Sequence, residues 1–130
     1  MNKPIILVVD DEKDARSTII NFLKERYECD FKEAKDGDEA VEYIKSNHCD
    51  IMILDIKMPR KSGMMVVKET KAIKPNIDIL IVSAWVSDDV AEEAMKLGAT
   101  DYAPKPLDLK AISLKFANIL KKRGYSNNKL

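Results

Sequence analysis

The sequence lacks both an excess of charge and a long apolar stretch. Its 130 residues carry 22 lysines and arginines against 22 aspartates and glutamates, so the formal net charge is zero. Proteins that bind nucleic acid electrostatically carry a basic excess, and we therefore expect no direct nucleic-acid binding. The aliphatic runs are about five residues long, too short to cross a bilayer, and the N-terminus has no signal-peptide pattern. These absences predict a cytoplasmic chain that makes no membrane contact.

Cysteine and glycine are also scarce, which narrows the classes of protein further. Cys29 and Cys49 have no CxxC spacing and are expected to be buried, reduced thiols. With His48 they could bind a metal ion, but their scattered positions do not match the usual ligand spacings. Only four glycines are present, and no GxGxxG loop follows the first apolar run, which argues against a dinucleotide-binding enzyme.

Short apolar segments alternate with amphipathic segments along the chain. The apolar segments predict strands, and the amphipathic segments, with apolar residues three and four apart, predict helices. The expected strands cover residues 4–9, 29–34, 50–55, 79–83 and 100–104. The expected helices cover residues 13–26, 36–47, 63–73, 87–98 and 108–123. This order predicts one α/β domain with a doubly wound parallel sheet, the first helix on one face and most of the others on the opposite face.

Polar side chains follow four of the expected strands. Asp10 and Asp11 follow the first strand, Asp55 ends the third, Ser83 the fourth, and Lys105 comes after the fifth. Ligand sites of open parallel sheets lie at the carboxyl ends of the strands, so these groups are expected to converge. Clustered carboxylates repel one another and need a cation, and Mg²⁺ favours such hard oxygen ligands.

These residues resemble the response-regulator receiver domain of two-component signalling, over about residues 3 to 123. The resemblance rests on Asp10-Asp11, on Asp55 with Pro59 and Gly63, on Ser83-Ala84, and on Tyr102 with Lys105-Pro106. It implies a single-domain, flavodoxin-like (βα)5 fold with strand order 2-1-3-4-5. We expect residues 1–123 to form the receiver domain and residues 124–130 to form a flexible C-terminal tail.

The resemblance also implies a phosphoacceptor site. Asp55 matches the aspartate that is phosphorylated by a partner phosphohistidine, and Ser83 and Lys105 match the hydroxyl group and the cation that contact the phosphoryl oxygens. Asp10 and Asp11, together with Asp55, match the Mg²⁺ ligands. The only catalysis expected is the Mg²⁺-dependent phosphorylation and dephosphorylation of the chain itself.

Further residues complete the implied site. The backbone carbonyl of Lys57 matches the remaining protein ligand of Mg²⁺. Ser83 and Tyr102 match a switch in which the serine turns toward the phosphoryl oxygens and the tyrosine enters the vacated space, reshaping the surface between the fourth strand and the last helix. Lys57 and Trp85 flank the site, and their bulk is predicted to limit the access of water and to lengthen the phosphorylated state. Trp85 could equally be a residue that contacts a partner.

Each of these residues also has an ordinary structural role as an alternative. Asp10 and Asp11 could cap the first helix, and Asp55 could begin a turn. Tyr102 could be a core aromatic, the serine a loop hydroxyl, and Lys105 a solvated charge. The ordered pattern at successive strand ends favours the phosphoacceptor site over a set of unrelated roles.

Two other functions fit parts of the pattern. A receiver-like binding module that acts without phosphorylation would lack one of the acids or the lysine, and none is missing. A phosphatase with an aspartate nucleophile would carry a second acid two residues after Asp55, where this chain has Lys57. The expected partners are a sensor histidine kinase or a histidine phosphotransferase, and a downstream protein target or an effector domain. The chain is expected to be a monomer or a weak dimer.

Overall fold

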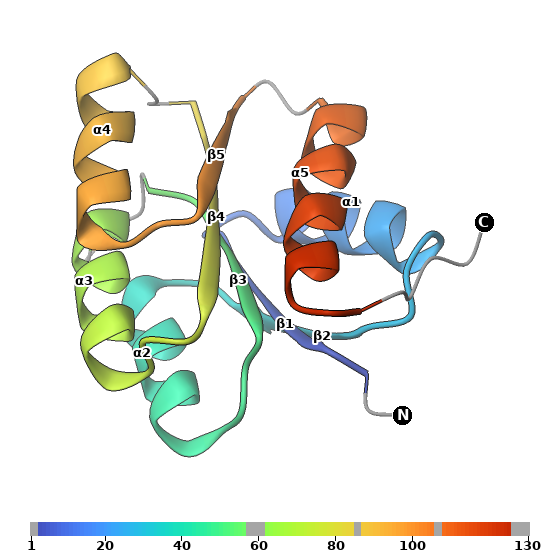
Figure 1. Ribbon diagram of the computed structural model, residues 1–130, viewed down its shortest axis with the longest axis horizontal. Coiled ribbons are helices and arrows are strands. Elements are labelled where there is room, and N and C mark those ends of the chain that lie inside the picture. The colour runs from blue at the N-terminus through green and yellow to red at the C-terminus, as the bar shows by residue number, and fades with distance from the viewer. Residues whose placement is uncertain (1–2, 57–61, 85–86, 106–107, 126–130) are drawn as a thin grey trace.

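The structure is a computed structural model that describes residues 3–56, 62–84, 87–105 and 108–125. Parallel strands form one sheet between two layers of helices (Figure 1). The strands are β1 (Ile5–Val9), β2 (Asp30–Ala34), β3 (Ile51–Leu54), β4 (Asp78–Ser83) and β5 (Asp101–Pro104). The helices are α1 (Lys13–Lys24), α2 (Gly37–Ser46), α3 (Gly63–Ile73), α4 (Asp88–Leu97) and α5 (Leu109–Lys122). The strand order β2-β1-β3-β4-β5 confirms the predicted flavodoxin-like sheet.

The two faces of the sheet pack against different helices. Ile6 and Val8 of β1 lie in a cluster with residues of α1 and α5, whereas Leu7 and Val9 lie in a cluster with residues of α2, α3 and α4. Figure 1 shows the same division, with α1 and α5 on one side of the sheet and the other helices opposite. Successive side chains of a strand point to opposite faces, so a strand covered on both sides must be apolar throughout. The predicted division of the helices is therefore confirmed.

Four helices begin with a side chain that accepts a hydrogen bond from the backbone. Each cap residue accepts from the N–H three positions later, which satisfies a donor that the first turn leaves free. The pairs are Asp36 with Glu39, Ser62 with Met65, Ser87 with Val90, and Asp108 with Ala111. The predicted cap at Ser87 is thus confirmed. Gly98 ends α4 as predicted, with a φ of 113°, in the left-handed region that glycine favours.

The first helix is shorter than predicted. It ends at Lys24 rather than Arg26, and the chain closes in a mixed turn. The N–H of Arg26 donates to the carbonyl of Leu23 at 3.0 Å, a three-residue bond, and the N–H of Tyr27 donates to the same carbonyl at 2.8 Å. The guanidinium of Arg26 lies 3.6 Å from the centroid of the Phe22 ring and donates to the carbonyl of Phe22. These contacts bring the chain back toward β2.

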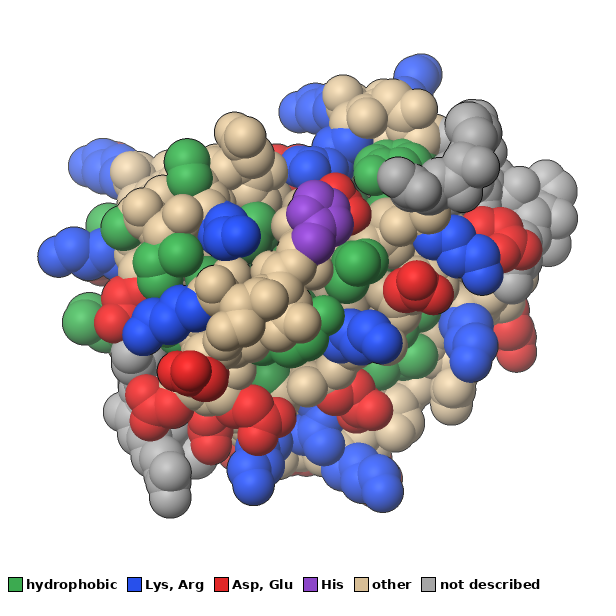
Figure 2. Space-filling model, turned by 90° about the horizontal axis from the view of Figure 1, so that it is seen from below, with side chains coloured by type: hydrophobic (Ala, Val, Ile, Leu, Met, Phe, Trp, Pro, Cys, Tyr) green, Lys and Arg blue, Asp and Glu red, His purple; other side chains and the backbone are tan. Residues whose placement is uncertain are grey.

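Charged side chains of both signs are spread over the surface. Figure 2 shows lysines and arginines interspersed with aspartates and glutamates on the face seen from below. This distribution agrees with the formal net charge of zero. Of the helices that the structure describes, none combines the length and the apolar character that a membrane span requires.

Candidate functional site

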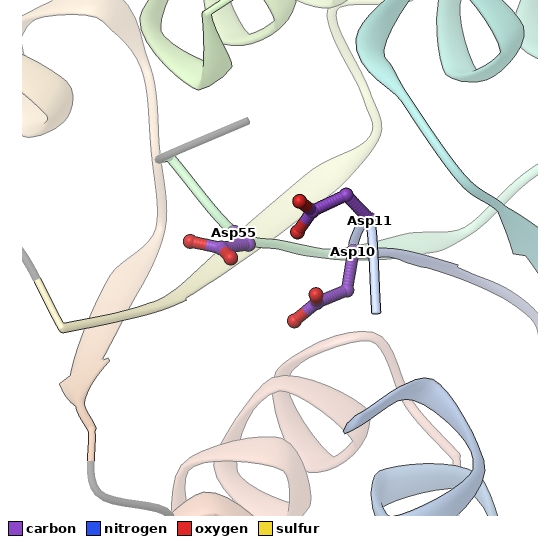
Figure 3. A group of neighbouring side chains, drawn as sticks. All are labelled: Asp10, Asp11 and Asp55. Atoms are coloured by element: carbon purple, nitrogen blue, oxygen red, sulfur yellow. The ribbon is translucent and has the colours of Figure 1, made fainter. Parts of the chain in front are cut away.

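Three aspartates meet at the carboxyl ends of β1 and β3. Asp10 and Asp11 follow β1, and Asp55 follows β3; the N–H of Asp55 donates to the carbonyl of Val9 at 3.0 Å, which extends the pairing of the two strands. One carboxylate oxygen from each aspartate lies within 4.8 Å of the others (Figure 3). Asp10 and Asp55 are 2% and 7% exposed, whereas Asp11 is open to solvent. The three acids therefore converge at this edge of the sheet, as predicted.

Lys105 bridges two of these carboxylates. Its Nζ lies 3.0 Å from Oδ2 of Asp10 and 3.3 Å from Oδ2 of Asp55. The backbone N–H of Lys105 donates to the carbonyl of Ser83 at 3.0 Å, which aligns the end of β5 with the end of β4. Burial by itself lowers the pKa of Lys105, but hydrogen bonds to Asp10 and Asp55 and their negative charges outweigh it and raise the pKa above its ordinary value. Lys105 is therefore not the solvated charge of the alternative interpretation.

The alternative role of Asp10 and Asp11 was to cap the first helix, and the contacts found are not those of a helix cap. The residue at the N-cap position of α1 is Glu12, which makes no side-chain cap hydrogen bond. Oδ1 of Asp10 accepts from the N–H of Glu12 at 2.9 Å, while its other oxygen contacts Lys105. Asp10 thus turns into the cluster of acids rather than over the first turn of the helix.

Gly63 holds the two ends of the loop after β3 together. Its N–H donates to the carbonyl of Ile56 at 2.8 Å. A Cβ atom built on Gly63 would lie 2.3 Å from Cα of Ile56 and 2.9 Å from the carbonyl oxygen of Asp55. Both neighbours are backbone atoms, so a side chain at this position would force the backbone of residue 63 away from that of Asp55 and Ile56. This close approach accounts for the glycine at position 63.

Ser83 and Tyr102 lie on neighbouring strands near this edge of the sheet. Ser83 is the last residue of β4 and is fully buried. Tyr102 is half-buried on β5, opposite Ile81, and packs against the apolar cluster on the α2, α3 and α4 side of the sheet. The Nζ atom of Lys115 on α5 lies 5.7 Å from the centroid of the Tyr102 ring. Lys57 and Trp85, the residues predicted to flank the site, lie outside the described residues.

The cysteine and histidine alternative finds no support in the structure. Among the residues that the structure describes, the three aspartates form the one group of three potential metal ligands. Cys49 is buried, its thiol donates to the carbonyl of Ile51 at 3.4 Å, and burial raises its pKa to about 12. Cys49 is thus the buried thiol that the sequence predicts, whereas Cys29, predicted to be buried as well, is only partly buried.

Two residues near the acids were not identified from the sequence. Nη1 of Arg16 donates to the backbone carbonyl of Asp10 at 2.7 Å, and Nε of Arg16 donates to Oε1 of Glu33 at 2.9 Å. Arg16 is on α1 and Glu33 is on β2, so the contact depends on how these elements pack. No spacing or motif in the sequence links them.

The chain belongs to the response regulator receiver domain family, whose family model matches residues 6–117. The transcriptional regulatory protein ZraR of Escherichia coli is 38% identical over 103 residues, which are 79% of this chain and 23% of ZraR. The transcriptional regulatory protein CiaR of Streptococcus pneumoniae is 30% identical over 122 residues, which are 94% of this chain and 54% of CiaR. The chain therefore spans about a quarter of ZraR and about half of CiaR.

Solved structures agree with this assignment. A two-component response regulator from Clostridium difficile superposes with a TM-score of 0.87 and 26% identity, covering 95% of this chain and all of the other. The receiver domain of the Francisella response regulator 1452 superposes with a TM-score of 0.85 and 29% identity, covering 93% and 99% of the two chains. The chain is therefore a receiver domain of the two-component response-regulator type.

The acidic cluster fits a divalent cation of the Mg²⁺ kind, which receiver domains generally bind at an acidic pocket. Its donors are hard carboxylate oxygens, close enough together to share one ion. In the part of the chain that the structure describes, the ammonium group of Lys105 contacts two of the three carboxylates and supplies one positive charge. Lys105 alone therefore leaves the cluster negative, and the exposed Asp11 keeps one side of it open to solvent.

Proposed function

We propose that this chain is a phosphoacceptor that receives a phosphoryl group on Asp55 from a phosphohistidine of a partner protein. The observation that carries the proposal is the convergence of Asp10, Asp11 and Asp55 within 4.8 Å, with Lys105 in contact with two of them. Three carboxylates gathered this closely supply the hard oxygen ligands that a divalent cation takes, and Lys105 contacts two of them. The proposed partner is a sensor histidine kinase or a histidine phosphotransferase.

The proposed reaction is an in-line displacement at phosphorus. A carboxylate oxygen of Asp55 forms the new O–P bond as the N–P bond of the phosphohistidine breaks, and the imidazole leaves with the electron pair and takes up a proton. Lys105, 3.3 Å from Asp55, offsets negative charge on the phosphoryl oxygens. Asp10, Asp11 and Asp55, with the backbone carbonyl of Lys57, are the proposed Mg²⁺ ligands. When bound, Mg²⁺ would neutralise charge on the acids and the phosphoryl group.

Dephosphorylation is proposed to use the same groups. Water attacks the phosphorus atom, the O–P bond to Asp55 breaks, and the carboxylate and inorganic phosphate are released. The chain thus catalyses only its own phosphorylation and dephosphorylation. We propose that Lys57 and Trp85 restrict the attacking water and lengthen the phosphorylated state. Trp85→Ala should then lose its phosphoryl group faster, and an unchanged rate would exclude Trp85 from this role.

The output is proposed to depend on Ser83 and Tyr102. Ser83 ends β4 at full burial and Tyr102 lies on the adjacent strand, half-buried, so a movement of the serine can change the space open to the ring. Reorientation of the two side chains would alter the surface from β4 to α5, which a downstream protein or an effector domain would read. Structures with and without a phosphoryl mimic test this switch, and unmoved Ser83 and Tyr102 side chains would contradict it.

The remaining proposals concern the setting in which the domain works. We place it in the cytoplasm, as a monomer or a weak dimer, with no direct binding to nucleic acid. The balanced charge and the interspersed surface charges support the last point.

The test is intact-mass measurement after incubation with Mg²⁺ and acetyl phosphate. Wild-type protein should gain one phosphoryl group, while Asp55→Asn and a Mg²⁺-free sample should gain none. Asp14→Asn, which removes an exposed acid in the first turn of α1, is the matched control and should gain the group. The alternative is a receiver-like module that binds partners without phosphorylation. It would be favoured by the absence of any adduct together with Trp85 fluorescence that responds to neither Mg²⁺ nor beryllofluoride.

A further inference from the structure

Arg16 connects three elements next to the acidic cluster. It is near the start of α1, donates from Nη1 to the carbonyl of Asp10 at 2.7 Å, and donates from Nε to Glu33 of β2 at 2.9 Å. Its side chain is only 13% exposed, whereas that of Glu33 is 46% exposed, so the bond to the carbonyl of Asp10 is the better shielded of the two. A guanidinium group can make two such bonds at once because its donors form a rigid fork.

The contact fixes the backbone between the two acids that follow β1. The N–H of Asp10 donates to the carbonyl of Ala34, and its carboxylate contacts Glu12 and Lys105. Arg16 adds a restraint on the carbonyl oxygen of Asp10. That oxygen belongs to the planar peptide group that joins Asp10 to Asp11. Holding the oxygen therefore fixes the orientation of the backbone N–H of Asp11.

The charge of Arg16 is directed away from the carboxylates. Glu33 pairs with Nε, and Nη1 contacts a neutral carbonyl group rather than a carboxylate of the cluster. Arg16 is therefore placed to orient the acids without competing with a cation for their oxygens.

We propose that Arg16, held by Glu33, is a positioning residue for the divalent-cation site. The inference rests on the proposed function, because it assumes that Asp10, Asp11 and Asp55 bind Mg²⁺. Outer partners that orient metal ligands commonly contribute about tenfold or more to metal affinity. Loss of the guanidinium leaves all three carboxylates in place but frees the peptide group before Asp11.

The test is calorimetric measurement of Mg²⁺ affinity for folded wild-type, Arg16→Ala, Arg16→Lys and Lys13→Ala proteins. Positioning predicts that Arg16→Ala weakens Mg²⁺ binding by about tenfold. Arg16→Lys should fall between Arg16→Ala and wild type, because an ammonium group lacks the fork that serves both Asp10 and Glu33. If Arg16→Lys binds Mg²⁺ as weakly as Arg16→Ala, both bonds of the guanidinium are needed. If Arg16→Lys binds Mg²⁺ as tightly as wild type, the inference is overturned.

The Lys13→Ala control separates positioning from charge. It removes an exposed cation from the first turn of the same helix, which by Coulomb's law alone should strengthen Mg²⁺ binding, by about twofold or less. If only the loss of charge mattered, Arg16→Ala would also bind Mg²⁺ more tightly. If Arg16 is a positioning residue, Arg16→Ala binds Mg²⁺ more weakly. Unchanged or tighter binding by Arg16→Ala overturns the inference.

Amide hydrogen exchange gives a readout that needs no metal ion. In Mg²⁺-free protein, Arg16→Ala should accelerate exchange at Asp11 and Glu12 severalfold, with circular dichroism confirming that the variant is folded. Exchange equal to that of wild type overturns the inference. If wild-type protein does not bind Mg²⁺, the proposed function fails, and the exchange result alone then decides whether Arg16 orders this peptide group.

Discussion

Two aspartates flank the four-residue strand β3, and their surroundings differ. Asp50 precedes the strand and Asp55 follows it, so they lie at opposite ends of the same sheet. Both are buried, at 4% and 7% exposure. Asp50 accepts hydrogen bonds from donors of several elements, whereas Asp55 belongs to a group of three acids, two of which contact Lys105.

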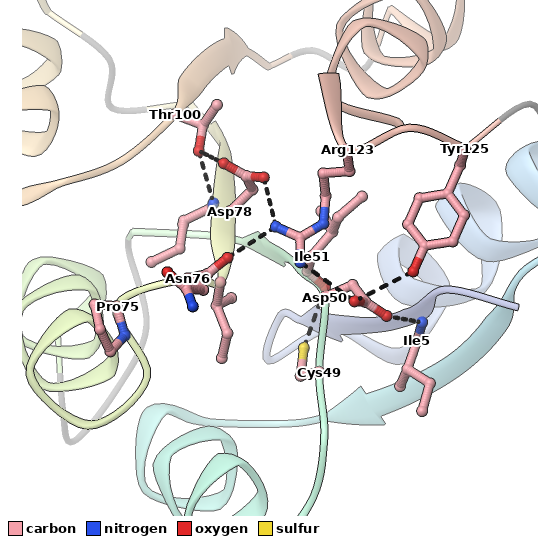
Figure 4. A network of polar contacts seen from close by, with 12 residues as sticks. Ile5, Cys49, Asp50, Ile51, Pro75, Asn76, Asp78, Thr100, Arg123 and Tyr125 are labelled. Atoms are coloured by element: carbon pink, nitrogen blue, oxygen red, sulfur yellow. Dashed lines mark hydrogen bonds and ion pairs between the residues drawn. The ribbon is translucent and has the colours of Figure 1, made fainter. Parts of the chain in front are cut away.

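At the amino end, donors from several elements converge on the acids (Figure 4). Asp50 accepts from the N–H of Ile5 at 2.8 Å, from Nη2 of Arg123 at 3.2 Å and from the hydroxyl of Tyr125 at 3.5 Å. Nη1 of Arg123 lies 2.8 Å from Oδ2 of Asp78. Burial by itself lowers the pKa of Arg123, but Asp78 and Asp50 outweigh it and raise the pKa above its ordinary value. Buried carboxylates that are satisfied in this way stabilise a fold and need no further ligand.

The contrast separates a structural group of acids from a functional one. Arg123 and a backbone N–H compensate Asp50, so its removal should weaken the fold. The three acids at the carboxyl end repel one another, so neutralising Asp55 should stabilise the fold slightly and remove the chemistry. Burial alone does not distinguish the two, because Asp50 and Asp55 are buried alike; the two further acids beside Asp55 do.

The largest expected effect on stability is that of Asp50→Ala. It leaves Arg123 and the N–H of Ile5 without their carboxylate, and breaking a buried ion pair of this kind costs about 3–5 kcal/mol. Urea unfolding measures the loss, with Asp14→Ala as a control for an exposed acid. A loss below about 1 kcal/mol would mean that Asp50 stabilises the fold no more than a surface acid does. The proposed difference between the two ends of β3 would then be wrong.

Gly63→Ala should affect both stability and chemistry at the carboxyl end. The new Cβ meets the backbone of Ile56 and Asp55, which cannot move aside as a flexible side chain would, and we expect a loss of about 1–3 kcal/mol. Phosphorylation of the remaining folded protein should fall as well. Gly124→Ala is the matched control: its φ of 84° also makes alanine unfavourable, but no atom lies within 4 Å of the new Cβ. Equal phosphorylation of the two variants would contradict the role of Gly63.

The same substitution at the two ends of β3 should change stability in opposite directions. Without Mg²⁺, Asp55→Asn removes one of three like charges and should raise the free energy of unfolding by about 1 kcal/mol. Asp50→Asn should lower it, because the amide cannot replace a carboxylate beside Arg123. Urea unfolding in the presence of a chelator compares them. Destabilisation by both substitutions would show that Asp55 is as fully compensated as Asp50.

A smaller effect is expected from the titration of Lys105. Its pKa is raised above the ordinary value of 10.5 in the folded protein, so its contribution is fully present below that value and is lost as the pH rises through the folded pKa. The difference in free energy of unfolding between wild type and Lys105→Met should therefore be constant at neutral pH and shrink in alkali. Lys122→Met, at an exposed lysine of the last turn of α5, is the control. A difference that grows with pH would contradict the assigned direction.

The sheet and the acid cluster were predictable because each depends on local sequence. Apolar runs of strand length give β1, β3 and β4, while β2 has a weaker pattern and the strand order was implied by the family resemblance. The rule that ligands gather at the carboxyl ends of parallel strands brings Asp10, Asp11 and Asp55 together. The end of α1 was predicted two residues too late, because its closing turn depends on contacts of Arg26 and Tyr27 that periodicity does not report.

The polar contacts of long side chains were not predictable in the same way. Arg16 and Glu33 are 17 residues apart, and Asp50 and Arg123 are 73 residues apart. Nothing in the spacing indicates which of many charged residues will meet once the helices pack on the sheet. Tyr125, assigned from the sequence to the tail, packs against the apolar cluster beside α1 and α5 and reaches Asp50. Residues 126–130 of the predicted tail lie outside the described residues.

The most direct test of the comparison is a Mg²⁺ titration followed by amide nuclear magnetic resonance spectra. Both ends of the sheet carry buried acids, but only the carboxyl end is expected to need a cation. We predict saturable shifts of the Asp10, Asp11 and Asp55 amide signals, with the Asp50 and Asp78 signals unchanged. Saturable shifts at Asp50 and Asp78, or none at the three carboxyl-end acids, would contradict it.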